Sequence, residues 1–272
     1  MVGKLYLVAT PIGNLEDITF RALRILKEVD IIAAEDTRVT LKLLNHYEIK
    51  KPLISNHRHN EDKNEDFLIS KLKEGKNIAI VSDAGTPGIS DPGEVIVKKA
   101  IKENIEVISI PGACAAISGL ICSGLDTNEF VFYGFLPLNK KNRKEKLEEL
   151  KNENKTAILY EAPHKIKETL KDLKQIIGER KVTIARELTK IHEEFIRGEI
   201  NEIIEKTENI KGEMILFIEG AKKVLLDNPL NSMSVEEHYK FYENQGLDKK
   251  EIIKKVAKDR GVTKNEIYKM FV

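Results

Sequence analysis

The chain has 272 residues and a net charge of +1, because 45 lysines and arginines nearly balance 44 aspartates and glutamates. That length allows two modest domains or one large one, and the balanced charge means that any contact with nucleic acid must come from local patches. No apolar run is long enough to span a bilayer, and the N-terminus enters a strand in place of a signal peptide, so we expect a cytoplasmic protein. Cys114 and Cys122 lie in a segment of small residues, which predicts small buried hydrophobes and no disulfide.

The first part of the chain alternates strand and helix patterns. Strands are expected at 5–9, 31–34, 52–55, 78–81 and 107–110, with helices at 18–29, 40–47, 62–74 and 94–101. Such alternation is typical of a mostly parallel sheet with helices on both faces.

After Gly124 the pattern changes to a mixed sheet. Strands are expected at 130–135, 156–160, 182–187, 193–198 and 213–218, and helices at 141–151 and 163–177. Because little helix separates the strands at 182–187 and 193–198, we expect them to pair antiparallel. The fold class is therefore α/β, with one α/β domain over 1–120 and a second over 121–224.

A small helical module is expected over 230–272. Ser234 is followed three residues later by Glu237, which is typical of a capped helix start. Residues 247–264 read as helix, glycine turn and helix, which resembles a helix-turn-helix module, although a solvated helical cap fits this spacing equally well.

The most informative loop is residues 82–93, which follow the apolar strand at 78–81 and precede a helix. Pro87 and Pro92 stiffen it, and its glycines allow a ligand to approach the backbone closely. Asp83 is placed to accept hydrogen bonds from ligand hydroxyls or an amine. Open α/β sheets bind ligands at this end of their strands.

Two other loops have the same character. Residues 9–15 follow the first strand, and residues 111–116 follow the strand at 107–110 with small side chains that leave room for a flat ligand. Neither is a GxGxxG or Walker A loop, so the fingerprints of dinucleotide and nucleoside triphosphate binding are absent. If the three strands are neighbours, their loops converge on one crevice.

Charged residues cluster at four further strand ends, over 34–38, 56–61, 161–165 and 185–190. Together they favour a polar active cleft. His57 and His59 have no third ligand at a recognisable spacing, so we expect no metal site, and no nucleophile elbow supports hydrolysis. A basic turn over 138–144 is suited to phosphates or to a solvated helix start.

Five motifs together carry a family resemblance: residues 10–15, 35–38, 82–93, 161–164 and 185–190. On these motifs, in order along nearly the whole chain, it resembles the bacterial 16S ribosomal RNA (cytidine-2′-O)-methyltransferases of the tetrapyrrole methylase superfamily. The resemblance implies two α/β domains with S-adenosylmethionine bound in a cleft between them, and a homodimer that acts on the small ribosomal subunit. The porphyrin enzymes of the superfamily usually have a glycine-rich first loop and Gly-Asp-Pro in the second, and the departure here favours the RNA branch.

The resemblance also implies functional residues. The cofactor site is implied to comprise Pro11, Asp83, Ala84, Gly85, Ile89, Cys114, Ala115, Tyr160, Arg186, Glu187 and Leu188. Residues suited to the phosphates around the target cytidine are Arg38, His57, Arg58, Arg143, Lys165 and Arg186. On this basis Asp83→Ala should abolish cofactor binding, whereas Arg38→Ala should spare it and lose RNA methylation.

Methyl transfer to a ribose hydroxyl needs alignment and a proton acceptor. The candidates are Glu35, Asp36 and Glu187, with Lys190 added if burial lowers its pKa. The sequence does not choose among them, nor between assembled 30S subunits and free RNA. The alternatives are a tetrapyrrole C-methyltransferase, disfavoured by the basic turn and tail, and a non-catalytic RNA-binding module, disfavoured by the crowded strand-end loops.

Overall fold

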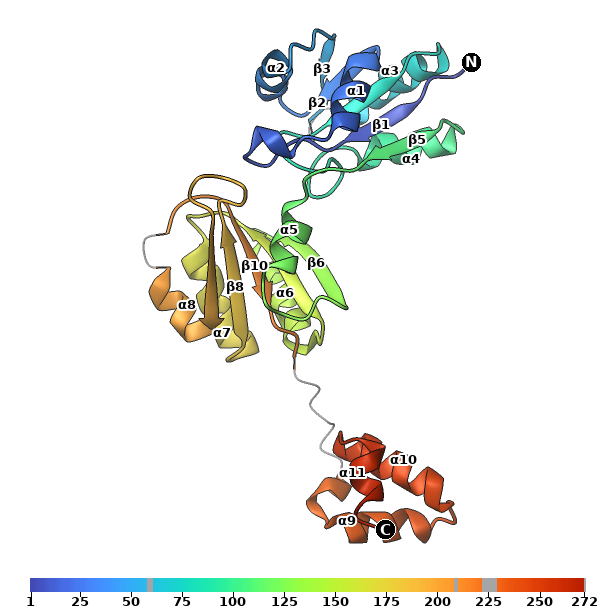
Figure 1. Ribbon diagram of the computed structural model, residues 1–272, viewed down its shortest axis with the longest axis vertical. Coiled ribbons are helices and arrows are strands. Elements are labelled where there is room, and N and C mark those ends of the chain that lie inside the picture. Colours follow the sequence, from blue (N-terminus) through green and yellow to red (C-terminus); the bar gives the residue numbers. More distant parts are fainter. Residues whose placement is uncertain (58–60, 208–209, 222–228, 272) are drawn as a thin grey trace. The chain divides into compact units, whose positions relative to one another are not determined.

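A computed structural model describes residues 1–57, 61–207, 210–221 and 229–271 (Figure 1). The chain divides into two units, Met1–Glu219 and Gly220–Val272. The first unit contains two five-stranded sheets, and the second contains helices. The predicted boundary near residue 120 falls inside a helix of the first unit, and the division of that unit into 1–120 and 121–224 stays a prediction.

The first sheet is parallel throughout, in the order β3-β2-β4-β1-β5. Its strands are β1 (Leu5–Val8), β2 (Ile31–Ala34), β3 (Leu53–Ser55), β4 (Ile78–Val81) and β5 (Val107–Ile110). Its helical segments are η1 (Leu15–Asp17), α1 (Phe20–Glu28), α2 (Thr37–His46), α3 (Glu61–Lys73) and α4 (Glu94–Lys102).

Strand β4 shows why this part of the sequence folds as a three-layer structure, because all four of its residues are buried. Ala79 and Val81 pack on the side of α1 and α2, whereas Ile78 and Ile80 pack on the side of α3 and α4. A central parallel strand that is apolar on both faces needs helices on both sides of the sheet. The predicted parallel sheet is confirmed.

The second sheet is mixed, in the order β6-β7-β10-β8-β9. Its strands are β6 (Phe130–Phe135), β7 (Thr156–Glu161), β8 (Lys181–Arg186), β9 (Glu194–Glu199) and β10 (Met214–Ile218). Strands β6 and β7 are parallel, and the remaining pairs are antiparallel. The predicted antiparallel pairing of β8 with β9 is confirmed.

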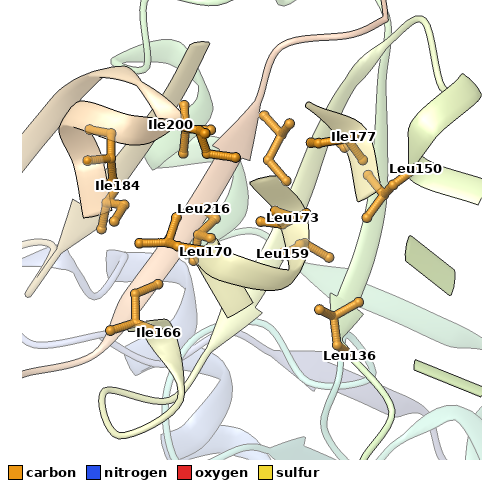
Figure 2. Packing of buried hydrophobic residues seen from close by; sticks show 14 of the residues in the cluster. Leu136, Leu150, Leu159, Ile166, Leu170, Leu173, Ile177, Ile184, Ile200 and Leu216 are labelled. Atoms are coloured by element: carbon orange, nitrogen blue, oxygen red, sulfur yellow. The ribbon is translucent and has the colours of Figure 1, made fainter. Parts of the chain in front are cut away.

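Three helices cover one face of the second sheet, namely α6 (Lys140–Asn152), α7 (Ile166–Ile177) and α8 (Ile200–Lys206). Figure 2 shows this core, in which Leu170 and Leu173 of α7 pack with Leu159 of β7 and Leu216 of β10. In α7 the apolar residues recur at helical spacing, so one stripe of the helix is buried against the sheet.

The opposite face of the second sheet packs against α5 (Ala115–Ile121). Gly119 permits this approach, because a Cβ atom there would lie 2.5 Å from Cζ of Phe217 in β10. The sequence analysis missed both α5 and α8, which have seven residues each and too few turns to show a clear periodicity. It was wrong about the burial of Cys122, which is exposed; Cys114 is half-buried, and both thiols are free.

The second unit begins with the 3₁₀ turn η2 (Pro229–Ser232), followed by α9 (Val235–Glu243), α10 (Lys249–Arg260) and α11 (Lys264–Tyr268). The predicted capped start at Ser234 is a full capping box with Glu237. Helix α10 ends at Gly261 in the left-handed conformation, with φ of 63°, before α11 begins. The predicted helix, glycine turn and helix are confirmed. None of the described helices is long and apolar enough to cross a membrane.

Candidate active site

A pocket of about 390 Å³ lies in the first unit, where loops of the parallel sheet meet the second sheet. The loops that follow β1, β4 and β5 all contribute to it. The residues that line it are Ile12, Ala84, Gly85, Thr86, Ile89, Ser90, Asp91, Cys114, Ala115, Phe135, Tyr160, Glu161, Ala162, Pro163, Ala185, Leu188, Glu213, Met214 and Ile215. Since β4, β1 and β5 are neighbours, the predicted convergence of the three loops is confirmed.

Hydrogen bonds fix the three loops to one another. Thr10 and Gly85 form a two-way backbone bridge, with N–O distances of 2.9 and 3.0 Å. The Thr86 hydroxyl donates to the carbonyl of Ala113 at 3.0 Å and so joins the second loop to the third. These bonds position the backbone of the pocket before any ligand arrives.

Gly85 is required at its position for two reasons. Its φ of +83° lies in the left-handed region, and a Cβ atom there would come within 3.1 Å of Cγ2 of Ile12. Any larger residue would push Ile12 into the pocket that both residues line.

Two aromatic rings form an apolar wall. Tyr160 at the end of β7 makes edge contacts with Phe132 and Phe135, at ring-centroid distances of 5.1 and 5.6 Å. Burial, followed by the proximity of Cys114, raises the pKa of Tyr160 to about 12. Its hydroxyl therefore stays protonated at neutral pH and does not serve as a base.

The structure places most of the implied cofactor residues in this pocket, namely Ala84, Gly85, Ile89, Cys114, Ala115, Tyr160 and Leu188. Pro11 and Asp83 line a separate cavity of about 250 Å³ instead. Arg186 and Glu187 line neither. Among the lining residues that were not predicted, Thr86 and Asp91 lie within the loop 82–93 and Ile12 lies within the loop 9–15. Phe135 ends β6 and carries no polar signal.

Asp83 belongs to a carboxylate cluster with the end of β2. Its carboxylate accepts a hydrogen bond from the backbone of Asp36 at 2.9 Å, and its own N–H donates to Glu35 at 3.3 Å. Desolvation raises the pKa of Asp83. In contrast, hydrogen bonds from the Arg38 side chain lower the pKa of Asp36 to about 2. Among the described residues, no group of three metal-ligating side chains is present.

A second charged group borders the pocket through Glu213. The Lys190 ammonium donates to Glu187 at 3.0 Å and to Glu213 at 2.9 Å, and the backbone of Glu213 donates to Glu187 at 2.8 Å. Burial alone would lower the pKa of Lys190, but the bonds to the two carboxylates outweigh it and raise this pKa. The condition under which Lys190 was a candidate base therefore fails.

Glu187 is a carboxylate outside the pocket lining, and it accepts a hydrogen bond from Glu213, which lines the pocket. The hydrogen bond from the Glu213 backbone, with smaller contributions from Lys190, lowers the pKa of Glu187. The Lys190 side chain, which binds Glu187, also lies close to the loop after β1: a Cβ atom at Gly13 would lie 2.5 Å from Cγ of Lys190.

The residues assigned to RNA phosphates divide into two groups. The Arg38 side chain is 86% exposed although it pairs with Asp36, so it can reach a ligand in solution. Lys165 and His57 are half-buried, and Arg58 lies outside the described residues.

Arg143 and Arg186 are both held by hydrogen bonds to other residues of the protein. The Arg143 side chain is 14% exposed, and it donates to Asp172 at 2.9 Å and to the Thr169 hydroxyl at 2.8 Å. Arg186 donates to Glu194 and to the carbonyl of Lys211, at 3.1 and 3.2 Å. These bonds of Arg143 join α6 to α7, and its assignment to RNA stays a prediction.

Known proteins share this architecture. A sequence model of the family described as Tetrapyrrole (Corrin/Porphyrin) Methylases matches residues 4–204. The crystal structure of uroporphyrin-III C-methyltransferase from Thermus thermophilus complexed with S-adenyl homocysteine matches with a TM-score of 0.55 and 16% identity, over 80% of this chain and 97% of that one. The fold and the pocket thus define a methyltransferase of the tetrapyrrole methylase class.

Two relatives match this chain along nearly its full length, and both are named ribosomal RNA small subunit methyltransferase I. The protein from Halalkalibacterium halodurans is 53% identical, over 99% of this chain and 94% of the relative. The protein from Bacillus subtilis is 50% identical, over 98% of this chain and 93% of the relative. The chain therefore belongs to the ribosomal RNA small subunit methyltransferase I family.

Proposed function

We propose that this chain uses S-adenosylmethionine to methylate the 2′-hydroxyl of a cytidine ribose in 16S ribosomal RNA. The observation that carries the proposal is the similarity of about half of all residues to ribosomal RNA small subunit methyltransferase I relatives over at least 98% of the chain. The choice of cytidine and of the 2′-oxygen rests on what the family resemblance of residues 10–15, 35–38, 82–93, 161–164 and 185–190 implies.

The pocket fits S-adenosylmethionine in its size and its walls. Its volume of about 390 Å³ is within the range of small-molecule sites. Phe135 and Tyr160 offer an apolar wall for a flat adenine ring, while Ala84, Gly85 and Ala115 leave the backbone open to close approach.

The charge of the pocket lining also fits. Asp91, Glu161 and Glu213 contribute carboxylates, and none of the described residues that line the pocket is basic. Such a lining favours a ligand that carries positive charge, as a sulfonium and an ammonium do, over a ligand rich in phosphates. This agrees with the absence of dinucleotide and triphosphate fingerprints.

S-adenosylmethionine, when bound, supplies an electrophilic methyl group on its sulfonium. The chain contributes position, because loops joined by the Thr10–Gly85 bridge and the Thr86 bond hold the ligand without further ordering. It also contributes a group that accepts the proton of the ribose hydroxyl. We assign this role to Glu187, because its partner Glu213 lines the pocket, whereas the Glu35 and Asp36 cluster lies beside the smaller cavity.

Glu187→Gln tests this assignment, since glutamine can still accept the hydrogen bonds from Lys190 and Glu213. We expect methyl transfer to fall at least about 100-fold, as the loss of a general base predicts, with cofactor affinity unchanged within about threefold. Glu35→Gln and Asp36→Asn are the matched controls. A rate that survives in Glu187→Gln and fails in Glu35→Gln would move the role to Glu35.

Transfer of tritium from S-adenosylmethionine tests the activity itself. The acceptors are under-methylated 30S subunits, free 16S RNA and a porphyrin precursor. We expect label in the ribosomal acceptors, at a nucleotide whose 3′ phosphodiester resists alkali because its 2′-oxygen is methylated. Label in the porphyrin precursor alone would favour the tetrapyrrole C-methyltransferase, and label in none of the three would refute both.

We also propose that the protein is a cytoplasmic homodimer. Apolar side chains that are exposed in the single chain support the dimer, namely Ile117 and Ile121 on α5 and Phe130 on β6. Sedimentation equilibrium should give twice the chain mass, and Ile121→Glu should shift the equilibrium toward the monomer. A monomeric mass for the unaltered protein at micromolar concentration would refute the dimer.

A further inference from the structure

Charge is distributed unevenly along the helical unit, which lies beyond the region matched by the family model. Residues 229–248 contain one lysine and four carboxylates. Residues 249–269, which form α10 and α11, contain eight lysines and arginines against three carboxylates. The helical unit is therefore acidic in its first part and basic in α10 and α11.

Four of these lysines surround one groove of about 550 Å³ between α10 and α11. Lys250 and Lys254 are one turn apart on α10, about 6 Å along its axis, and Lys264 begins α11. Lys249 stands over the ring of Tyr268, with its Nζ atom 5.9 Å from the ring centroid. The groove thus combines a line of ammonium groups with one aromatic ring.

Two of the three carboxylates in residues 249–269 bind partners outside this groove. Asp259 accepts a hydrogen bond from Tyr242 at 2.5 Å and contacts the buried His238 at 3.3 Å. Glu266 accepts from the backbone of Thr263 at 2.8 Å in a capping box. Within the described part of the chain, none of the four groove lysines forms an ion pair with a carboxylate.

The Tyr268 ring is available to a ligand. Tyr268 is 51% exposed, and it takes no part in the apolar core of the unit, which is built on Ile252, Val256 and Ile267. Exposed aromatic rings beside cationic side chains are how proteins hold single-stranded nucleic acid, with bases stacked on rings and phosphates on cations.

We propose that this groove binds a single strand of ribosomal RNA, with Lys250, Lys254 and Lys264 on successive phosphates and Tyr268 stacked on a base. The inference rests on the proposed function, because it takes the substrate to be ribosomal RNA. It adds a second RNA-binding site on the helical unit, separate in sequence from the methyl-transfer pocket. The groove contributes affinity for RNA and takes no part in the transfer step.

The test uses the full-length chain with Lys250→Gln, Lys254→Gln and Lys264→Gln combined. Each phosphate contact on single strands contributes about 0.7 to the slope of log K against log salt, so the slope should fall by about 2. If the two proteins bind protein-free 16S RNA equally at 1 M salt, this difference in slope makes the Kd of the triple variant about 100-fold higher than that of the unaltered protein at 0.1 M salt. Tyr268→Ala should raise the Kd about tenfold.

The matched control is Lys240→Gln, Lys258→Gln and Lys269→Gln combined, which removes the same charge from exposed positions outside the groove. This variant should bind RNA as the unaltered protein does, and replacement of the three groove lysines by arginine should retain affinity. Circular dichroism at 222 nm should be the same for all of them, because every altered lysine is exposed.

The outcomes separate this proposal from the proposed function. Groove variants should show a raised KM for RNA, with unchanged kcat and unchanged affinity for S-adenosylmethionine. Equal losses in the groove and control variants, or no loss in either, would overturn the groove while leaving the methyltransferase intact. A loss on intact 30S subunits but not on protein-free 16S RNA would overturn it in favour of a ribosomal protein contact. An unaltered protein that labels no RNA would instead refute the proposed function.

Discussion

The hydrogen bond from Thr86 to Ala113 joins two loops of the pocket, and its removal measures how far that bond prepares the pocket for its ligand. Thr86→Val keeps the branched shape of the side chain but cannot donate to the Ala113 carbonyl, which accepts at 3.0 Å. Both residues are half-buried, so water can partly replace the lost donor.

The expected loss of stability in Thr86→Val follows from the partial exposure of Thr86 and Ala113. A neutral hydrogen bond contributes about 0.5–1.5 kcal/mol net, and a fully buried carbonyl left without a donor costs about 1–3 kcal/mol. Because Ala113 is half-buried, we take about 1 kcal/mol for the free energy of unfolding, which is about 2–4 °C in Tm for a chain of this size. If the bond also holds the loops for the ligand, the same 1 kcal/mol raises the Kd for S-adenosylmethionine about fivefold.

Isothermal titration calorimetry with S-adenosylmethionine and thermal denaturation of the same preparations give both numbers. Thr86→Ser is the control, since its hydroxyl restores the donor and should recover most of the affinity. If Thr86→Val binds S-adenosylmethionine fivefold more weakly and Thr86→Ser recovers the affinity, the hydrogen bond shapes the pocket before the ligand binds. A lower Tm with an unchanged Kd would refute the reasoning, because the bond would then stabilise the fold without shaping the site.

Three further predictions follow from the same geometry. Asp83→Asn should keep the affinity for S-adenosylmethionine within about threefold in titration calorimetry, because the carboxylate lines the smaller cavity; a complete loss would restore its assignment to the cofactor. Arg143→Leu should lower the free energy of unfolding by about 2 kcal/mol in urea, because it leaves the half-buried Asp172 unpaired, whereas Arg38→Ala should leave stability unchanged and reduce RNA methylation. Equal stability of the two variants would contradict this. The pKa of Tyr160 is raised from 10.0 to about 12, so its contribution to stability is complete below pH 10 and is lost as the pH rises toward 12. Tyr160→Phe should flatten that decline in unfolding free energy, and an unchanged slope would count against the burial of the hydroxyl.

Local sequence patterns predicted most of the strands because these segments are largely apolar. The strands at 31–34, 78–81, 107–110 and 130–135 have the predicted bounds, since each is apolar and ends at turn-forming residues. The short helices α5 and α8 were not predicted, because seven residues give two helical turns at most. In addition, α5 is composed largely of small residues, which are equally common in loops.

The site was predictable to the level of its loops but not of its side chains. Neighbouring parallel strands send their following loops to one edge of the sheet, so the convergence of loops after β1, β4 and β5 needed only the strand order. Whether Asp83 faces the pocket, or whether Arg143 is free, depends on partners such as Asp36 and Asp172 that lie far away in the sequence. Such pairings arise from tertiary packing and leave no local signal.

The residues that line the pocket range in sequence from Ile12 to Ile215, and this span has a consequence for the synthesis of the protein. At a synthesis rate of about 5–20 residues per second, the first loop waits roughly 10–40 s on the ribosome before β10 has been made. During that time the nascent parallel sheet can form its own core, but no methyl donor can be held, because Met214 and Ile215 are still absent. Ligand binding therefore stabilises only chains that have been translated past β10, and a chain that terminates early gains nothing from the cofactor in the cell.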